Sequence, residues 1–494
     1  MSPQVKSHSH RLALLLLTAS ALVAAGCGSG STASSNTQNN NTPTGPAFLV
    51  GTDAPMASVV SFQVQVESVE LTNSSGATVN LLASGSTPTV DFARYDGLQG
   101  LVDMTDVKQG TYTGVTITLG SATIGYLDTT KTPPAISTMQ VTYSPSTSST
   151  VSAQLNQSLN VANGGAPVGL RIDFDLAKSI GVDSNGNITG DVNPTFDVST
   201  VARTDTGAHI DLLIGAVVTP PTNTSSEPNS FVIQGPHGEQ FTIDTTSTTN
   251  WDGAATLAEL NSNSIVQVAG QLDPADQTLD ADEVAVLSDS NFYADGLITS
   301  VTQTTGAATG FDFYVRSVLP SSLKDVTLGD IAQVDLTGSE NYYIYWMHNA
   351  MTQFLFTGST LTPGQEISVG GTDAEATPSN GAAINVNRIH LQDWGYNGTI
   401  VPKSQSSANG LFQMTVNGFA GVVVPSTVTV YLGPACDYRY GLGAFSDLAD
   451  STNVRVVGLL LNVGRSEFSN GNLVLVARHV DGLNFTDMAT ASAN

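Results

Sequence analysis

The sequence predicts a mainly β protein, with an N-terminal antiparallel β-sandwich followed by about three small barrel-like β units. Apolar and polar residues alternate with the period of a strand in many short segments, such as residues 62–71. Charged residues make up only 12% of the chain, and Ser, Thr, Asn and Gly fill the remainder as they do in exported β modules. One order of short strands also recurs three times after His209.

The N-terminus predicts export. Lys6 and Arg11 precede an apolar run at residues 12–25, which is the order of a signal peptide. The run is shorter than the roughly 20 apolar residues that a membrane-spanning helix needs. Small residues 24–26 then lead into Cys27. This segment resembles the lipobox of bacterial lipoproteins, and the resemblance implies cleavage before the cysteine and attachment of fatty acyl chains to it.

Acylation of Cys27 would anchor the protein to the cell envelope, because two or more acyl chains hold a protein stably on a membrane. Gly28 follows the cysteine, and within the family that this segment resembles, a residue other than aspartate at this position implies transfer to the outer membrane. The alternative is an ordinary secreted protein cleaved near Ala25. The expected membrane contact is therefore the lipid on Cys27.

The segments divide by composition and pattern. They are a signal peptide (1–26), a flexible polar tether (27–46), a β-sandwich (47–204), barrel-like units at 205–290, 291–394 with an insertion, and 395–486, and a disordered tail (487–494). With 42 acidic and 16 basic residues the formal net charge is −26, which disfavours nucleic acid as a partner. Cys436 is the one cysteine besides Cys27, so acylation would leave no intramolecular disulfide.

The first folded unit has the alternation of half-buried antiparallel strands. In residues 62–71 the alternation changes parity, which predicts a bulge near Ser68. Asp53 precedes Pro55 in an expected turn, and residues 183–187 are an expected hairpin turn. The segments at 52–55, 66–71, 110–119 and 170–176 resemble, in order, the bacterial domain-of-unknown-function family 4382. The resemblance implies an exported β-sandwich and no assigned activity.

The later units repeat one pattern of about five strands. Each copy begins with a strand around a glycine and later has a strand closed by a glycine. These glycines are Gly215, Gly296 and Gly398 in the first position and Gly270, Gly371 and Gly458 in the second. The order resembles the oligosaccharide/oligonucleotide-binding barrel and the bacterial domain-of-unknown-function family 5666, although copies two and three carry long insertions. The acidic charge argues against nucleic acid even on such barrels.

Two patterns are weak candidates for ligand sites. Four carboxylates around an expected hairpin could bind calcium or form a solvated surface, with Asp280 and Asp282 on one face of a strand. A dense aromatic stretch could stack on sugar rings or form a strand buried on both sides. The calcium candidates are Asp273, Asp276, Asp280 and Asp282, and the aromatic candidates are Tyr342, Tyr343, Tyr345 and Trp346.

The sequence contains no constellation that we interpret as catalytic. The histidines are scattered without the spacing of a transition-metal site, and Cys436 has the surroundings of a small buried residue. We expect a non-enzymatic, lipid-anchored envelope protein with a binding or spacer role, whose partner is a polysaccharide or another envelope protein. The alternative is a carboxylate-dependent hydrolase of surface polysaccharide, which would need two carboxylates roughly 5 to 9.5 Å apart across a cleft.

The anchor prediction is tested by Cys27→Ser. We expect the variant to leave the membrane fraction, because serine cannot carry the thioether-linked lipid. The measurement is membrane fractionation with immunoblotting, and Cys436→Ser is the matched control. Membrane association of Cys27→Ser equal to that of the parent chain would contradict the prediction.

Overall fold

The structure is a computed structural model. It describes residues 44–482 except 55–58, 96–97, 129, 132–134, 145–148, 164–167, 203–207, 222–228, 236–237, 253–256, 274–277, 305–306, 321–325, 345–353, 374–382, 409, 417–426, 440 and 464–472. Cys27, the expected signal peptide and the expected C-terminal tail lie outside these ranges. Within them, none of the helices has the length and apolar character needed to cross a membrane.

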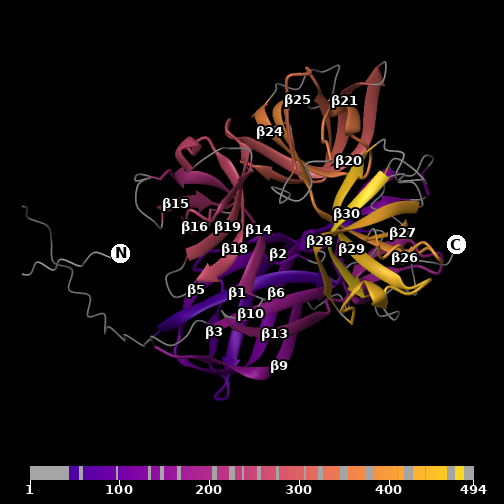
Figure 1. The fold of residues 1–494 in the computed structure, drawn as a ribbon. Coiled ribbons are helices and arrows are strands. Elements are labelled where there is room, and N and C mark those ends of the chain that lie inside the picture. Colours follow the sequence, from indigo (N-terminus) through magenta and orange to yellow (C-terminus); the bar gives the residue numbers. More distant parts are fainter. Residues whose placement is uncertain are drawn as a thin grey trace, which may run out of the picture. The chain divides into compact units, whose positions relative to one another are not determined.

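The N-terminal unit is a β-sandwich, shown by the indigo and purple strands of Figure 1. One sheet has the order β13-β10-β1-β5, and the other has the order β3-β2-β6-β7, with β4 on β2 and β9 on β6. The elements are β1 (Thr44–Ala54), β2 (Val59–Asn73), β3 (Thr78–Asn80), β4 (Thr89–Asp91), η1 (Phe92–Tyr95), β5 (Gly100–Lys108), β6 (Gly110–Asp128), β7 (Ala135–Gln140), β8 (Thr142–Tyr143), β9 (Thr150–Val161), β10 (Val168–Asp175), α1 (Leu176–Ser179), β11 (Ile180–Val182), β12 (Ile188–Val192) and β13 (Phe196–Ala202).

The sandwich core lies between the two sheets. Phe62 of β2 packs on Phe174 of β10 with ring centroids 4.9 Å apart. The bulge expected near Ser68 is confirmed by a register shift between Val66 and Ser68 in the β2–β6 ladder. The expected hairpin at residues 183–187 is also confirmed, because its first aspartate accepts backbone and side-chain hydrogen bonds between β11 and β12.

The sandwich differs from the expectation in three details. Strands β1 and β10 pair in parallel, so the sheet is not wholly antiparallel. β1 begins at Thr44, so the last residues assigned to the tether belong to a strand, where Pro46 pairs with Asp106. Asp53 lies in β1 and pairs with Phe174 instead of forming a turn. The alternation around Asp53 is too short to predict pairing, which is fixed by the neighbouring strands.

The three later units are closed five-stranded barrels with one topology. The pairings run β14-β15-β16-β19-β18-β14, β20-β21-β22-β25-β24-β20 and β26-β27-β28-β30-β29-β26. Counted in chain order within each barrel, the third strand (β16, β22 or β28) pairs in parallel with the last strand (β19, β25 or β30). The other neighbouring pairs are antiparallel. The three copies therefore share the barrel that the repeated strand order predicts.

The barrel strands appear from magenta to yellow in Figure 1. The elements are β14 (His209–Thr219), β15 (Asn229–Gln234), β16 (Gln240–Thr245), β17 (Asn250–Asp252), η3 (Leu257–Glu259), β18 (Ile265–Asp273), β19 (Thr278–Ser288), β20 (Phe292–Thr304), β21 (Ala307–Leu319), β22 (Ile331–Asp335), β23 (Asn341–Ile344), η4 (Gly358–Thr360), β24 (Glu366–Asp373), β25 (Ala383–Gln392), β26 (Trp394–Ile400), β27 (Leu411–Val416), β28 (Thr427–Arg439), η5 (Phe445–Asp447), β29 (Asn453–Asn462) and β30 (Leu473–Gly482).

In each barrel a glycine in the fourth strand (β18, β24 or β29) lets that strand approach the last strand (β19, β25 or β30) closely. In all three barrels the ladder between these strands shifts register at the glycine that closes the repeat pattern. A Cβ atom there would collide with a backbone carbonyl oxygen of the last strand, so only glycine fits the bulge. The distances from that Cβ position would be 2.2 Å for Gly270 to Asp280, 2.0 Å for Gly371 to Asn385 and 2.0 Å for Gly458 to Val476.

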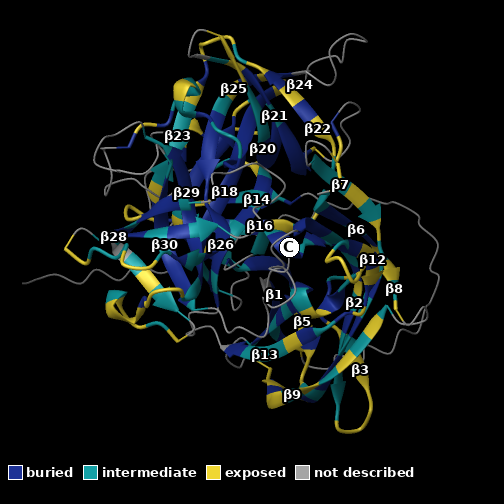
Figure 2. Ribbon diagram, turned by 90° about the vertical axis from the view of Figure 1, so that its right-hand side faces the viewer, coloured by how far each residue is buried: buried dark blue, intermediate teal, exposed yellow. Residues whose placement is uncertain are grey.

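Some strands are buried on both faces because they separate two cores. In β1, Leu49 faces the sandwich core while Phe48 and Val50 join the core of the first barrel. In β29, Leu460 faces the third barrel while Leu459 joins the core of the second. Figure 2 shows β29 largely in the dark blue of buried residues. The units are therefore joined by shared apolar strands.

The glycine role is tested by Gly458→Ala. We expect a loss of about 3 kcal/mol in the free energy of unfolding, since the added methyl group meets a carbonyl oxygen of β30 that cannot move without breaking the barrel. Chemical denaturation followed by fluorescence measures this loss. Gly443→Ala is the control, because its Cβ would meet only an Asp447 oxygen at 3.5 Å. Equal stability of the two variants would contradict the role assigned to Gly458.

Candidate binding pocket between the sandwich and the first two barrels

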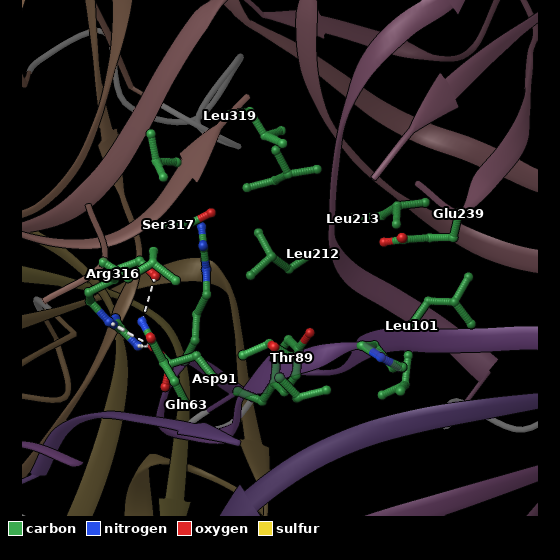
Figure 3. Close-up of a pocket in the computed structure, with 18 of the residues that line it drawn as sticks. Gln63, Thr89, Asp91, Leu101, Leu212, Leu213, Glu239, Arg316, Ser317 and Leu319 are labelled. Carbon is green, nitrogen blue, oxygen red and sulfur yellow. Dashed lines mark hydrogen bonds and ion pairs between the residues drawn. The ribbon is translucent and has the colours of Figure 1, made fainter. Parts of the chain in front are cut away.

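A pocket of about 430 Å³ lies where the sandwich, the first barrel and the second barrel meet. Figure 3 shows Arg316, Asp91 and Gln63 on one side of it and Glu239, Leu213 and Leu101 on the other. Its size is within the range of small-molecule sites, which also favour domain interfaces. The apolar part of the wall is formed by Leu101, Leu212, Leu213, Val318, Leu319 and Leu328.

A bulge in the second barrel places Arg316. Asp295 pairs with Ser317 while Gly296 pairs with Val315, so Arg316 is the extra residue of β21. A Cβ atom on Gly296 would lie 1.7 Å from the carbonyl oxygen of Tyr314, so the glycine permits this geometry. The repeat glycine of the sequence thus positions a charged side chain. β-Bulges often turn side chains in this way at functional sites.

The polar side of the pocket is held by reciprocal ion pairs between the sandwich and the second barrel. Arg316 donates from Nη2 to Asp91 Oδ2 at 3.0 Å and from Nη1 to Glu366 Oε1 at 3.3 Å. In the opposite sense, Arg94 of η1 is paired with Asp295 of β20. Each unit therefore contributes one guanidinium and one carboxylate to the pairs between them. Such pairs compensate the large cost of burying an isolated charge.

Neighbouring groups fix the two arginines in place. Tyr293 donates from its hydroxyl to Asp295 Oδ2 at 2.7 Å. Gln63 Nε2 donates to the carbonyl oxygen of Arg316 at 3.0 Å. The guanidinium of Arg316 lies 4.0 Å from the ring centroid of Trp394, the first residue of β26, which adds a cation–π contact from the third barrel. Arg316, Arg94, Asp91, Asp295 and Glu366 together form a charged cluster. These side chains are fixed in place and mostly closed to water.

Glu366 is the surplus acid of this cluster, in which three carboxylates face two guanidiniums. Burial raises its pKa to about 7, with the charge of Arg316 opposing the shift and that of Asp295 adding to it. Its Oε2 atom and Asp295 Oδ1 are buried and have no hydrogen-bond partner among the described residues. A proton on Glu366 would remove the excess negative charge of the cluster.

Asp91 is held in a way that is unsuited to hydrolysis. Both oxygens of Asp91 are engaged, because Oδ1 accepts from the backbone N–H of Phe62 at 2.8 Å and Oδ2 accepts from Arg316. A carboxylate held this way is poorly placed to attack a substrate or to move a proton. Cys436 is also a poor nucleophile, since burial raises the pKa of its thiol to about 12.

The calcium candidates do not converge among the residues that the structure describes. Asp280 and Asp282 share the exposed face of β19, as strand alternation predicts. Asp282 lies 3.3 Å from His209 Nε2. Asp273 ends β18 and pairs with Thr278, while Asp276 lies outside the described ranges. No group of three or more His, Cys, Asp or Glu side chains suited to a metal is found in those ranges.

The aromatic candidates that can be placed do not form an exposed row. Tyr342 and Tyr343 are half-buried in the short strand β23. Tyr342 packs edge-on against Phe356, and Tyr343 stacks on His390 with centroids 4.6 Å apart. One ring face of Tyr343 and the ring of Tyr342 thus make contacts inside the protein. Tyr345 and Trp346 lie outside the described ranges.

The sequence predictions missed the pocket residues. Arg316 stands within the apolar strand 311–319, in a chain with only 16 basic residues. A lone arginine in such a strand is a usable signal, since a buried guanidinium requires acidic partners. Those partners are Asp91, 225 positions away, and Glu366, 50 positions away. No local pattern could have identified them.

Comparison with known proteins places only the N-terminal unit. Residues 48–189 match the family described as "Domain of unknown function (DUF4382)", which agrees with the resemblance seen in the sandwich motifs. No curated protein matches the chain. Among solved structures, the chain is similar to "drosophila Unr CSD456", with 11% identity over 56% of this chain and 98% of that chain. The TM-score is 0.14, which is too low to support an argument.

The charged cluster predicts a pH-dependent stability. The pKa of Glu366 in the folded protein, about 7, exceeds its ordinary value of 4.5. The folded state therefore holds more protons than the unfolded state between these pH values, and stability falls as pH rises through them. We expect Glu366→Gln to remove about 3 kcal/mol of this fall.

The measurement is chemical denaturation of the parent chain and of Glu366→Gln at pH 5 and pH 8. Glu259→Gln, a substitution at an exposed residue of η3, is the control and should keep the dependence of the parent chain. If Glu366→Gln has the same pH dependence as the control, the assignment of the titrating group to Glu366 is wrong.

Proposed function

We propose that this chain is an exported envelope protein, anchored by lipid on Cys27, that binds a small amphipathic molecule without transforming it. The observation that carries the proposal is the pocket between the sandwich and the first two barrels, here called the junction pocket. In this pocket an apolar wall lies beside the fixed charged cluster. The three barrels are further proposed to be diverged copies of the unit found in the domain-of-unknown-function family 5666. In this view the outer membrane is the site of anchoring.

The arrangement of the units supports a binding role. Three of the four folded units contribute to the charged cluster or its cation–π contact, and the first barrel contributes to the apolar wall. The shape of the pocket therefore depends on how the units pack, and the shared strands β1 and β29 make that packing firm. A preformed pocket reduces the entropy lost on binding. The engaged oxygens of Asp91 argue against a hydrolytic role for that carboxylate.

The proposal is tested by filling the pocket with Ser317→Phe. Ser317 is a partly exposed lining residue, and in Figure 3 it lies in the middle of the pocket. A phenyl ring there would occupy the space that an apolar ligand needs. We expect the parent chain to bind the neutral dye Nile red with a rise in fluorescence, and Ser317→Phe to bind it at least tenfold more weakly, which corresponds to about 1.4 kcal/mol.

The dye experiment uses the full-length Cys27→Ser chain, which carries no lipid and needs no detergent. Ser446→Phe, which adds the same ring at an exposed position of η5, is the matched control and should bind dye like the parent chain. No saturable dye binding, or equal binding by the Ser317→Phe and Ser446→Phe variants, would overturn the proposed binding function.

A further inference from the structure

At the polar end of the pocket, the guanidinium of Arg94 has N–H groups that bond to no described residue. Arg94 reaches Asp295 and the hydroxyl of Tyr293 through Nη2 alone. Among the described residues, no acceptor faces its Nε and Nη1 groups. Its side chain is 14% exposed and lines the pocket. An arginine whose remaining N–H groups bond to no described residue at the polar end of a pocket favours a ligand that supplies an anionic oxygen, because such hydrogen bonds are charge-assisted.

The rest of the pocket defines the ligand body. Leu101, Val318 and Leu319 are buried to more than 90%, and together with Leu212 and Leu213 they form an apolar wall beyond the arginine. Leu328 is 44% exposed at the same pocket. An alkyl chain would bury apolar surface along this wall while its head group meets Arg94. Apart from Glu239, the lining beyond the arginines is mainly apolar. Charge at the arginine end and mainly apolar surface along the rest match an amphiphile.

Charge balance within the cluster links this ligand to a proton. Glu366 pairs with Leu297 across β20 and β24, so it shares a face with Asp295 two positions away. The groups that act on Glu366 are Arg316 of β21, Asp295 of β20, Arg94 of η1 and Asp91 of β4, and Glu366 in turn acts on Tyr396 of β26. Two guanidiniums and three carboxylates give a net charge of −1. A bound anion together with a proton on Glu366 leaves that charge unchanged.

We propose that the junction pocket binds a free amphipathic carboxylate, with its head group on Arg94 and its alkyl chain along the leucine wall, and that binding is accompanied by proton uptake at Glu366. This inference rests on the proposed binding function and specifies the ligand of the same pocket. The affinity for the carboxylate then rises as pH falls through 7. The proton on Glu366 keeps the bound anion from adding a second uncompensated negative charge to the cluster.

The experiment measures displacement of Nile red from the full-length Cys27→Ser chain by three ten-carbon probes at pH 6 and pH 8. The probes are decanoate, decanol and decyltrimethylammonium. A simple carboxylate stays ionised at both pH values. We expect decanoate to displace dye best, with about tenfold higher affinity at pH 6 than at pH 8, and decanol to show no such dependence.

Two variants separate the head-group contact from the proton. Arg94→Gln should weaken decanoate about tenfold and leave decanol unchanged. Glu366→Gln should keep the preference for decanoate and lose its pH dependence. Should Arg94→Gln fail to fold, the parent chain and Glu366→Gln still decide the matter.

The outcomes distinguish this inference from the proposal on which it rests. If the dye binds but decanol or decyltrimethylammonium displaces it as well as decanoate does, the carboxylate inference is wrong and the binding function stands. If decanoate wins without a pH dependence, the proton uptake is wrong. If the dye does not bind, the binding function itself fails, and the inference falls with it.

Discussion

Two guanidiniums buried between the sandwich and the second barrel constrain how these two units dock. Arg316 and Arg94 each cross the boundary to an acid of the other unit. A buried charge without its partner costs several kcal/mol, so the units cannot shift relative to one another without exposing the pairs to water or leaving them broken. The pairs thus favour one docking geometry, and the pocket exists only in that geometry.

Glycine-dependent bulges connect the barrel repeat to the site. In the fourth strand of every barrel they let two backbones approach and the ring close. In the first strand of the second barrel, Gly296 permits the bulge from which Arg316 emerges. Glycine-dependent bulges therefore close each small barrel, and in the second barrel another such bulge orients the side chain of Arg316.

The acidic character of the chain has different consequences at the surface and at the junction. At the surface, the formal net charge of −26 gives the chain a negative electrostatic field. At the junction, a surplus carboxylate is retained among two arginines, and burial raises its pKa to about 7. If a ligand adds a negative charge to the cluster, a proton on Glu366 compensates that charge. The same group makes folding stability depend on pH, so stability and binding would share one titration.

The sequence alone determined the β architecture, the bulge near Ser68 and the repeated five-strand unit, because alternation and glycine placement are local consequences of strand geometry. It also supplied the Cys27 hypothesis, which lies outside the described residues. The parallel pairing of β1 with β10 and the partners of Arg316 and Arg94 were decided by tertiary structure. These contacts join residues about 50 to 225 positions apart, and their energy comes from burial that exists only after the units have docked.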